Sequence, residues 1–131
     1  MIEARRQTIL VIDDSPFVLA VTRVALEEAG YAVAIAEDLV SFERHRVEVS
    51  PDLILVDVQM PEAFGDDIAS TLRGVRGVKV PILLVSSLDE EELAQRAANA
   101  EVAGFVSKRA GLAELVRRVN QVLGSTSTGV A

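Results

Sequence analysis

Three aspartates in this chain each come directly after a short apolar run. Asp13 and Asp14 follow "ILVI", and Asp57 follows "LILV". If these runs are neighbouring strands of one sheet, the three carboxylates share a cleft. Carboxylates held together repel one another, and at least one pKa rises unless a cation relieves the repulsion. Magnesium prefers oxygen ligands and often acts on phosphate groups, so the pattern indicates a site for a hard divalent cation.

A hydroxyl and an ammonium group follow two later apolar runs. Ser86 follows "ILLV", and Lys108 follows "GFVS". In open parallel sheets, ligands bind at the carboxyl ends of the strands, so both groups are expected in the same cleft. Each residue also has a structural explanation, because an aspartate can cap a helix and a lysine is usually a solvated surface charge. The combination, rather than any single residue, predicts a functional site.

Alternating strands and helices must position these groups. The run at residues 31–36 is weaker and rich in alanine, which suits an edge strand. Strands alternating with helices favour a parallel sheet covered on both faces, so the expected fold class is α/β. The remaining strands are expected at residues 8–13, 52–57, 80–86 and 103–107.

Capping signals define the first helix. Ser15 is a natural N-cap, Pro16 suits the first helical position and Gly30 suits the residue after the C-terminus. Residues 125–131 are small and polar, so we expect a domain over residues 1–124 followed by a flexible tail or the start of a linker. Further helices are expected near residues 39–49, 64–75, 89–100 and 111–124.

Composition narrows the class of protein. The chain has 131 residues, enough for one domain with a core. Its net charge of −7 disfavours direct contact with nucleic acid or an anionic membrane. Cysteine is absent, which excludes disulfides and thiol chemistry, and no apolar run reaches membrane-spanning length. We therefore expect a cytoplasmic location.

Four segments together resemble the receiver domain of two-component response regulators. They are "VIDDSPF", "LILVDVQMPEAFG", "LLVSS" and "AGFVSK", in that order, and the resemblance covers residues 8 to about 124. Stand-alone regulators of the chemotaxis type are similar. The resemblance implies a three-layer, flavodoxin-like (βα)5 fold with a five-stranded parallel sheet of order 2-1-3-4-5.

The resemblance also implies a role for each residue of the cleft. Asp57 would accept a phosphoryl group from the phosphohistidine of a histidine kinase or a histidine phosphotransfer protein. Lys108 and Ser86 would contact the phosphoryl oxygens, and Ser86 and Phe105 would form a conformational switch. Mg²⁺ or Mn²⁺ would be held by Asp13, Asp14, Asp57 and the backbone carbonyl of Gln59.

The same resemblance predicts two protein-binding surfaces. A downstream protein would bind the face made by residues 80–124, and the phosphodonor would dock on the first helix beside Arg109. The expected buried stripe of that helix is Val18, Val21, Ala25 and Ala29. The expected docking residues are Phe17, Ala20 and Val24, with Arg109.

Other readings of the sequence remain open at this stage. Arg109 replaces the proline that usually follows the family's lysine, so the bond after Lys108 is expected to be trans. This departure is the one support for a pseudo-receiver, an interaction module without phosphate turnover. A phosphatase with an aspartate nucleophile or a flavin carrier fits less well, because the first loop lacks their motifs. The sequence does not decide between a stand-alone regulator and part of a longer protein.

Overall fold

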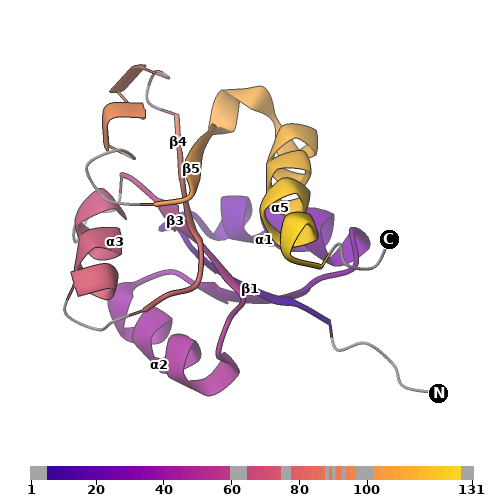
Figure 1. The fold of residues 1–131 in the computed structure, drawn as a ribbon, viewed down its shortest axis with the longest axis horizontal. Coiled ribbons are helices and arrows are strands. Elements are labelled where there is room, and N and C mark those ends of the chain that lie inside the picture. The colour runs from indigo at the N-terminus through magenta and orange to yellow at the C-terminus, as the bar shows by residue number, and fades with distance from the viewer. Residues whose placement is uncertain are drawn as a thin grey trace.

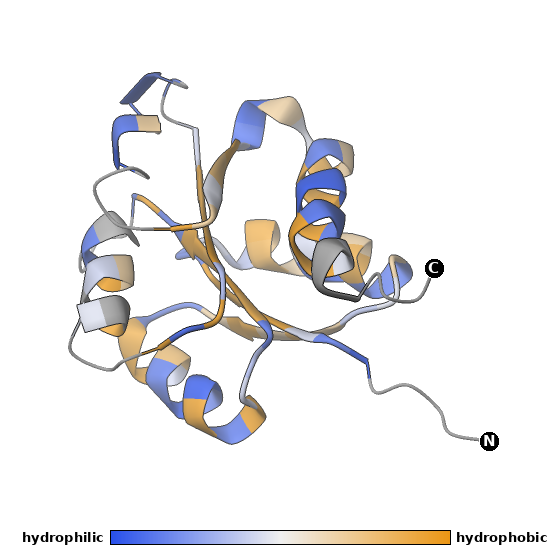
Figure 2. Ribbon diagram, viewed as in Figure 1, coloured by the Kyte–Doolittle hydropathy of each residue, from blue (hydrophilic) through white to orange (hydrophobic). Residues whose placement is uncertain are grey.

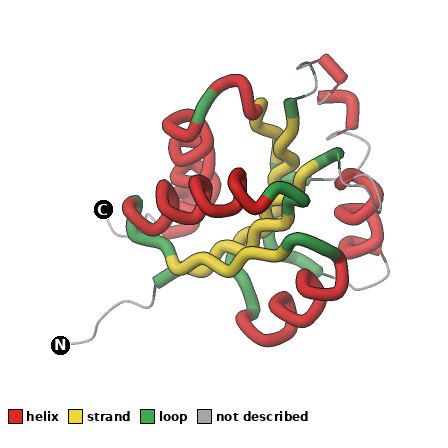
Figure 3. Tube along the Cα trace, turned by 180° about the vertical axis from the view of Figure 1, so that it is seen from behind, coloured by secondary structure: helices red, strands yellow, loops and turns green. Residues whose placement is uncertain are grey.

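The computed structural model shows a five-stranded parallel sheet between two layers of helices (Figures 1 and 3). It describes residues 6–59, 65–74, 78–87, 89, 91–92, 94–96 and 102–127. All neighbouring strands are parallel, in the order β2-β1-β3-β4-β5, which confirms the expected fold. The strands are β1 (Thr8–Ile12), β2 (Ala32–Ala36), β3 (Leu53–Asp57), β4 (Ile82–Ser86) and β5 (Gly104–Ser107).

Helices follow the strands as the sequence predicted. Residues 91–92 and 94–96 are helical within the helix predicted at 89–100, whose remaining positions, apart from Asp89, lie outside the described residues. No helix in the described part of the chain is long and apolar enough to cross a membrane. The helices with continuous bounds among the described residues are α1 (Pro16–Glu28), α2 (Leu39–Val49), α3 (Gly65–Gly74), the short 3₁₀ helix η1 (Lys108–Ala110) and α5 (Leu112–Ser127).

The last helix is longer than the sequence indicated. Residues 125–127, expected at the start of a tail, continue α5. The domain boundary at residue 124 and the flexibility of the residues after it stay predictions.

Alternate residues of the central strands face opposite helical layers. On β1, Ile9 and Val11 belong to the apolar cluster that includes α1 and α5, while Leu10 and Ile12 belong to the cluster that includes α2 and α3. Figure 2 shows the central strands as mostly apolar, and the helices with apolar and polar residues mixed along their length. Because both faces of these strands are covered, their sequences read as continuous apolar runs without alternation.

The first helix begins and ends as predicted. Ser15 Oγ accepts a hydrogen bond from the backbone N–H of Val18 at 3.2 Å, and Pro16 is the first helical residue. Gly30 has a φ of 102°, a left-handed conformation that glycine adopts without a Cβ clash. These signals place the start of α1 directly after the aspartate pair.

The predicted buried stripe of α1 is wrong. The buried residues of α1 are Leu19, Thr22 and Leu26, so the helix is rotated by about one position relative to the expectation. The leucine side chains are larger than those of the predicted stripe, and turning them toward the sheet buries more apolar surface. In the predicted stripe, Val18, Val21 and Ala25 are half-buried. Ala29 is exposed.

Candidate functional site

The carboxyl ends of three strands bring charged groups together. Asp13 follows β1 directly, Asp57 is the last residue of β3, and Lys108 follows β5. The two aspartates are each only 3% exposed. β1 and β3 are hydrogen-bonded neighbours, so their ends lie side by side although 44 residues separate Asp13 from Asp57 (57 − 13 = 44). The strand order therefore creates the predicted cleft.

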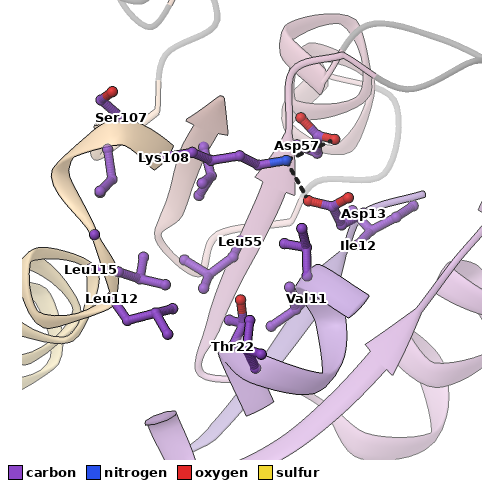
Figure 4. A pocket seen from close by; sticks show the side chains of 15 residues that line it. Val11, Ile12, Asp13, Thr22, Leu55, Asp57, Ser107, Lys108, Leu112 and Leu115 are labelled. Carbon is purple, nitrogen blue, oxygen red and sulfur yellow. Dashed lines mark ion pairs between the residues drawn. The ribbon is translucent and has the colours of Figure 1, made fainter. Parts of the chain in front are cut away.

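Lys108 bridges the two buried carboxylates (Figure 4). Its Nζ lies 2.8 Å from Asp13 Oδ2 and 3.5 Å from Asp57 Oδ2. The backbone after it turns at once into η1, where Ser107 Oγ accepts a hydrogen bond from the N–H of Arg109 at 3.1 Å. The described residues contain no cis peptide bond, so the bond between Lys108 and Arg109 is trans, as expected. The lysine thus reaches both carboxylates without the family's proline.

Burial makes the carboxyl group of Asp57 a weak acid. Desolvation, with smaller contributions from the neighbouring charges of Asp13 and Asp14, raises the net pKa of Asp57 to about 6. The backbone N–H of Gln59, which donates to Asp57 Oδ1 at 3.0 Å, and the ammonium of Lys108 lower the pKa in part. Above pH 6 the site therefore holds an ionised but poorly solvated carboxylate.

The two aspartates stabilise the charged ammonium form of Lys108. Burial lowers the pKa of Lys108, but its hydrogen bonds and ion pairs with Asp13 and Asp57 outweigh burial, and the net pKa is raised. At neutral pH the lysine is fully charged, and it faces an excess of negative charge on the aspartates.

The raised pKa of Asp57 makes stability depend on pH. In the folded state the pKa is about 6, against 3.8 for the ordinary group. Above pH 6 Asp57 is ionised in both the folded and the unfolded protein, and the raised pKa destabilises the folded state by its full amount. Below about pH 4 Asp57 is protonated in both states, so this destabilisation is absent. In a chelator, Asp57→Asn should raise the free energy of unfolding by up to about 3 kcal/mol at pH 7.5, since each pKa unit corresponds to about 1.4 kcal/mol.

Chemical denaturation at several pH values measures this effect. The stability difference between Asp57→Asn and wild type should shrink as the pH falls from 6.5 to 4 and vanish near the lower end. A difference that stays constant over this range, or an asparagine variant less stable than wild type at pH 7.5, contradicts the pKa assignment.

Three carboxylates in the cleft form a group suited to a cation. One oxygen each from Asp13, Asp14 and Asp57 lies within 4.8 Å of the other two, with Asp14 exposed to solvent. Both Asp13 oxygens already have partners, since Oδ1 accepts from the N–H of Ser15 at 3.0 Å and Oδ2 pairs with Lys108. An all-oxygen donor set with one open side fits Mg²⁺, which keeps several of its waters.

The structure adds a contact that the sequence analysis missed. The side-chain Oε1 of Gln59 accepts hydrogen bonds from Ser86 Oγ at 3.2 Å and Ser87 Oγ at 3.3 Å. Sequence reasoning had assigned Gln59 only a backbone carbonyl as a metal ligand. The feature that could have revealed this contact is the expected strand order. Neighbouring strands β3 and β4 end at the same edge of the sheet and bring residues 59 and 86 side by side.

The remaining predicted site residues lie around this centre. Phe105 on β5 is half-buried and packs against the cluster on the α2–α3 side of the sheet. Arg109 is exposed in η1. On α1, Phe17 is 74% exposed and Val24 55%, and Ala20 is exposed with them. The residues Met60 and Pro61 of the segment "LILVDVQMPEAFG" lie outside the described residues.

An apolar pocket lies next to the ion pairs (Figure 4). It has a volume of about 190 Å³ and is formed by strand residues together with α1 and the start of α5. Lys108 lines it together with Asp13 and Asp57, so its polar end belongs to the site described above. Its apolar lining includes Val11, Val18, Val21, Leu55, Val106, Leu112 and Leu115.

Residues 9–120 match the family model of the response regulator receiver domain. The match covers most of the chain, so the protein belongs to the receiver domain family of two-component response regulators.

Curated relatives agree with this family. The chain is 32% identical over 124 residues to the phosphate regulon transcriptional regulatory protein PhoB of Pseudomonas aeruginosa, covering 94% of this chain and 54% of that protein. It is 36% identical over 124 residues to the transcriptional regulatory protein PrrA of Mycobacterium tuberculosis, covering 92% of this chain and 52% of that protein. The chain thus spans about half the length of the curated relatives it matches.

Solved structures show the same fold. The chemotaxis response regulator CheY4 of Vibrio cholerae superposes with a TM-score of 0.80 at 24% identity, covering 90% of this chain and 99% of that one. A LuxR-family two-component response regulator from Aurantimonas superposes with a TM-score of 0.81 at 28% identity, covering 92% of this chain and 87% of that one. The fold expected from the sequence is therefore confirmed, while the roles of individual residues stay predictions.

Proposed function

We propose that this domain receives a phosphoryl group on Asp57 from the phosphohistidine of a histidine kinase or histidine phosphotransfer protein. The observation that carries the proposal is the position of Asp57. Its carboxylate is buried at the end of β3, and Lys108 Nζ lies 3.5 Å from its Oδ2. A carboxylate at the end of a buried strand is held rigidly, and this one faces the ammonium group of Lys108. Both features suit attack on an electrophilic phosphorus.

The chain's own residues supply positioning and charge. An Asp57 oxygen attacks phosphorus as the bond from phosphorus to the imidazole nitrogen breaks, and the imidazole leaves. Negative charge spreads over the phosphoryl oxygens in the transition state, where the ammonium of Lys108 can neutralise one of them. The hydroxyl of Ser86 would donate to another oxygen, so that both groups bind the product.

The acidic cluster would hold Mg²⁺, or Mn²⁺ in its place. Asp14, Asp57 and the backbone carbonyl of Gln59 would be the direct protein ligands, and Asp13 would act mainly through water because both its oxygens are engaged. When bound, the cation neutralises the carboxylates and the incoming phosphoryl oxygens. The domain would promote its own phosphorylation and dephosphorylation without acting as an enzyme on other substrates.

Phosphorylation would switch a protein-binding face. Ser86 would move toward the phosphoryl group and Phe105 would turn inward, so the surface made by β4, β5, α5 and the helical residues 91–92 and 94–96 would change. The output would be contact with a downstream protein in the cytoplasm, with no direct contact to nucleic acid or membrane. The net charge of −7 supports this choice of partner.

Chemical trapping tests the assignment of the acceptor. After incubation with Mg²⁺ and acetyl phosphate, borohydride reduction converts an aspartyl phosphate into homoserine, which peptide mapping can locate. We expect homoserine at position 57 alone. Homoserine at position 13 or 14, or stable phosphate on Ser86, would contradict the proposal. No modification anywhere would favour the alternative, a pseudo-receiver that acts only by binding.

The exposed apolar residues of α1 are proposed to dock the phosphodonor. α1 begins beside Asp14, so a helical partner resting on Phe17, Ala20 and Val24 could present its histidine to Asp57. Phe17→Ala should slow phosphoryl transfer from the cognate donor about tenfold, as expected for loss of a large aromatic anchor at an interface. Labelling by acetyl phosphate should stay near the wild-type rate.

Transfer kinetics with the two donors separate docking from chemistry. Val47→Ala is a control for truncation of an exposed apolar side chain, because Val47 is 68% exposed but lies on α2. It should change neither rate. Equal slowing of Phe17→Ala with both donors would mean that Phe17 supports the fold or the cleft and not the partner.

A further inference from the structure

A single amide oxygen joins the two loops beside Asp57. Gln59 Oε1 accepts hydrogen bonds from Ser86 Oγ at 3.2 Å and from Ser87 Oγ at 3.3 Å. The backbone N–H of Gln59 donates to Asp57 Oδ1 at 3.0 Å. The residue that holds the two hydroxyls is therefore itself attached to the carboxylate that would be phosphorylated.

The hydroxyl of Ser86 cannot serve two acceptors at once. Ser86 is fully buried at the end of β4, and a hydroxyl carries one donor hydrogen. The proposed function requires that hydrogen to point at a phosphoryl oxygen on Asp57. In the structure Ser86 Oγ donates to Gln59 Oε1 at 3.2 Å. The hydrogen bond to Gln59 must therefore break before Ser86 can bind the phosphoryl group.

We propose that the Gln59 side chain is a latch that holds Ser86 in the unphosphorylated arrangement and so sets how readily the domain switches. The latch consists of the hydrogen bonds from Ser86 and Ser87 to Gln59 Oε1. Gln59 is a positioning residue in this account, because its side chain acts on the phosphoryl group only through Ser86. The inference rests on the proposed phosphoacceptor role of Asp57.

Bond strengths allow the latch to open on phosphorylation. The latch joins neutral groups, whereas a hydrogen bond to a phosphoryl oxygen is charge-assisted and roughly twice as strong. The phosphoryl group can thus draw Ser86 away from Gln59, but the hydrogen bond to Gln59 must be given up and opposes the movement. Removing the latch acceptor should favour the phosphoryl-bound arrangement about fivefold, which corresponds to about 1 kcal/mol for one neutral hydrogen bond.

The variant Gln59→Met tests the latch directly. Methionine keeps the length of the side chain and the backbone groups but lacks the carbonyl oxygen. Beryllofluoride with Mg²⁺ serves as the probe, because it binds a carboxylate as a stand-in for the phosphoryl group. NMR titration should show about fivefold tighter binding to Gln59→Met than to wild type. Equal or weaker binding by a variant that melts like wild type would overturn the latch.

Two further variants show whether the effect passes through Ser86. In a Ser86→Ala background, Gln59→Met should leave the affinity for beryllofluoride unchanged, since no hydroxyl remains to be released. A persistent fivefold gain in that background would overturn the latch. Gln7→Met, the same exchange just before β1 and so at the opposite end of that strand from Asp13, should have no effect, and a comparable gain there would overturn the latch too.

The same titration separates the latch from the proposed function. If wild type binds beryllofluoride and the Gln59→Met ratio is one, only the latch fails. If wild type neither binds beryllofluoride nor takes up a phosphoryl group from acetyl phosphate, the phosphoacceptor role fails and the latch fails with it.

Discussion

Asp57→Asn should abolish phosphorylation by acetyl phosphate and by the cognate histidine donor alike. The asparagine amide is not a nucleophile for this reaction, and the neighbouring carboxylates lack the placement of Asp57 at the end of β3. Phosphate-affinity electrophoresis and intact mass measure the loss. We expect modification at background level, an all-or-none effect and the largest among our predictions.

A matched control makes this result specific. Asp52→Asn is the same exchange just before the start of β3, where the Asp52 carboxylate accepts a hydrogen bond from the N–H of Thr8 at 2.8 Å. The control should be phosphorylated like wild type. Substantial labelling of Asp57→Asn would move the acceptor to another residue.

Asp14→Asn should weaken Mg²⁺ binding and stabilise the metal-free protein. Asp14 is the exposed member of the cluster, and its charge can be removed without breaking the ion pair of Asp13 with Lys108. Loss of one carboxylate ligand should lower the affinity for Mg²⁺ by at least about tenfold, or about 1.4 kcal/mol. Removing a like charge should raise the melting temperature in a chelator.

Calorimetric titration with Mg²⁺ and melting curves with and without the metal test both parts. Glu28→Gln, at the opposite end of α1, removes the same charge far from the cluster and should leave Mg²⁺ affinity unchanged. An Asp14→Asn protein that binds Mg²⁺ like wild type would show that the cluster is not the metal site. A lower melting temperature in chelator would contradict the repulsion argument alone.

The sequence predicted the architecture because its signals are local. Apolar runs define the strands, and Ser15 and Gly30 define the ends of α1. The convergence of Asp13, Asp57 and Lys108 then follows from the strand order, which came from the resemblance to receiver domains, since parallel strands end at one edge. These predictions needed no knowledge of how any side chain packs.

Predictions that depended on side-chain packing were less successful. The buried face of α1 follows from how Leu19 and Leu26 fill the space above the sheet, which periodicity alone did not resolve. The bridge from Gln59 to Ser86 depends on a side-chain conformation across two strands. Likewise, the sequence could not say that Lys108 lies closer to Asp13 than to Asp57.

The most direct test of the central claim is the intact mass of the wild-type protein after incubation with acetyl phosphate, in Mg²⁺ and in a chelator. The proposed phosphoacceptor role predicts one added phosphoryl group with Mg²⁺ and little or none with the chelator. The added group should disappear on treatment with hydroxylamine, which cleaves acyl phosphates. An unchanged mass in Mg²⁺, or a phosphoryl group that survives hydroxylamine, would contradict the claim that Asp57 is the acceptor.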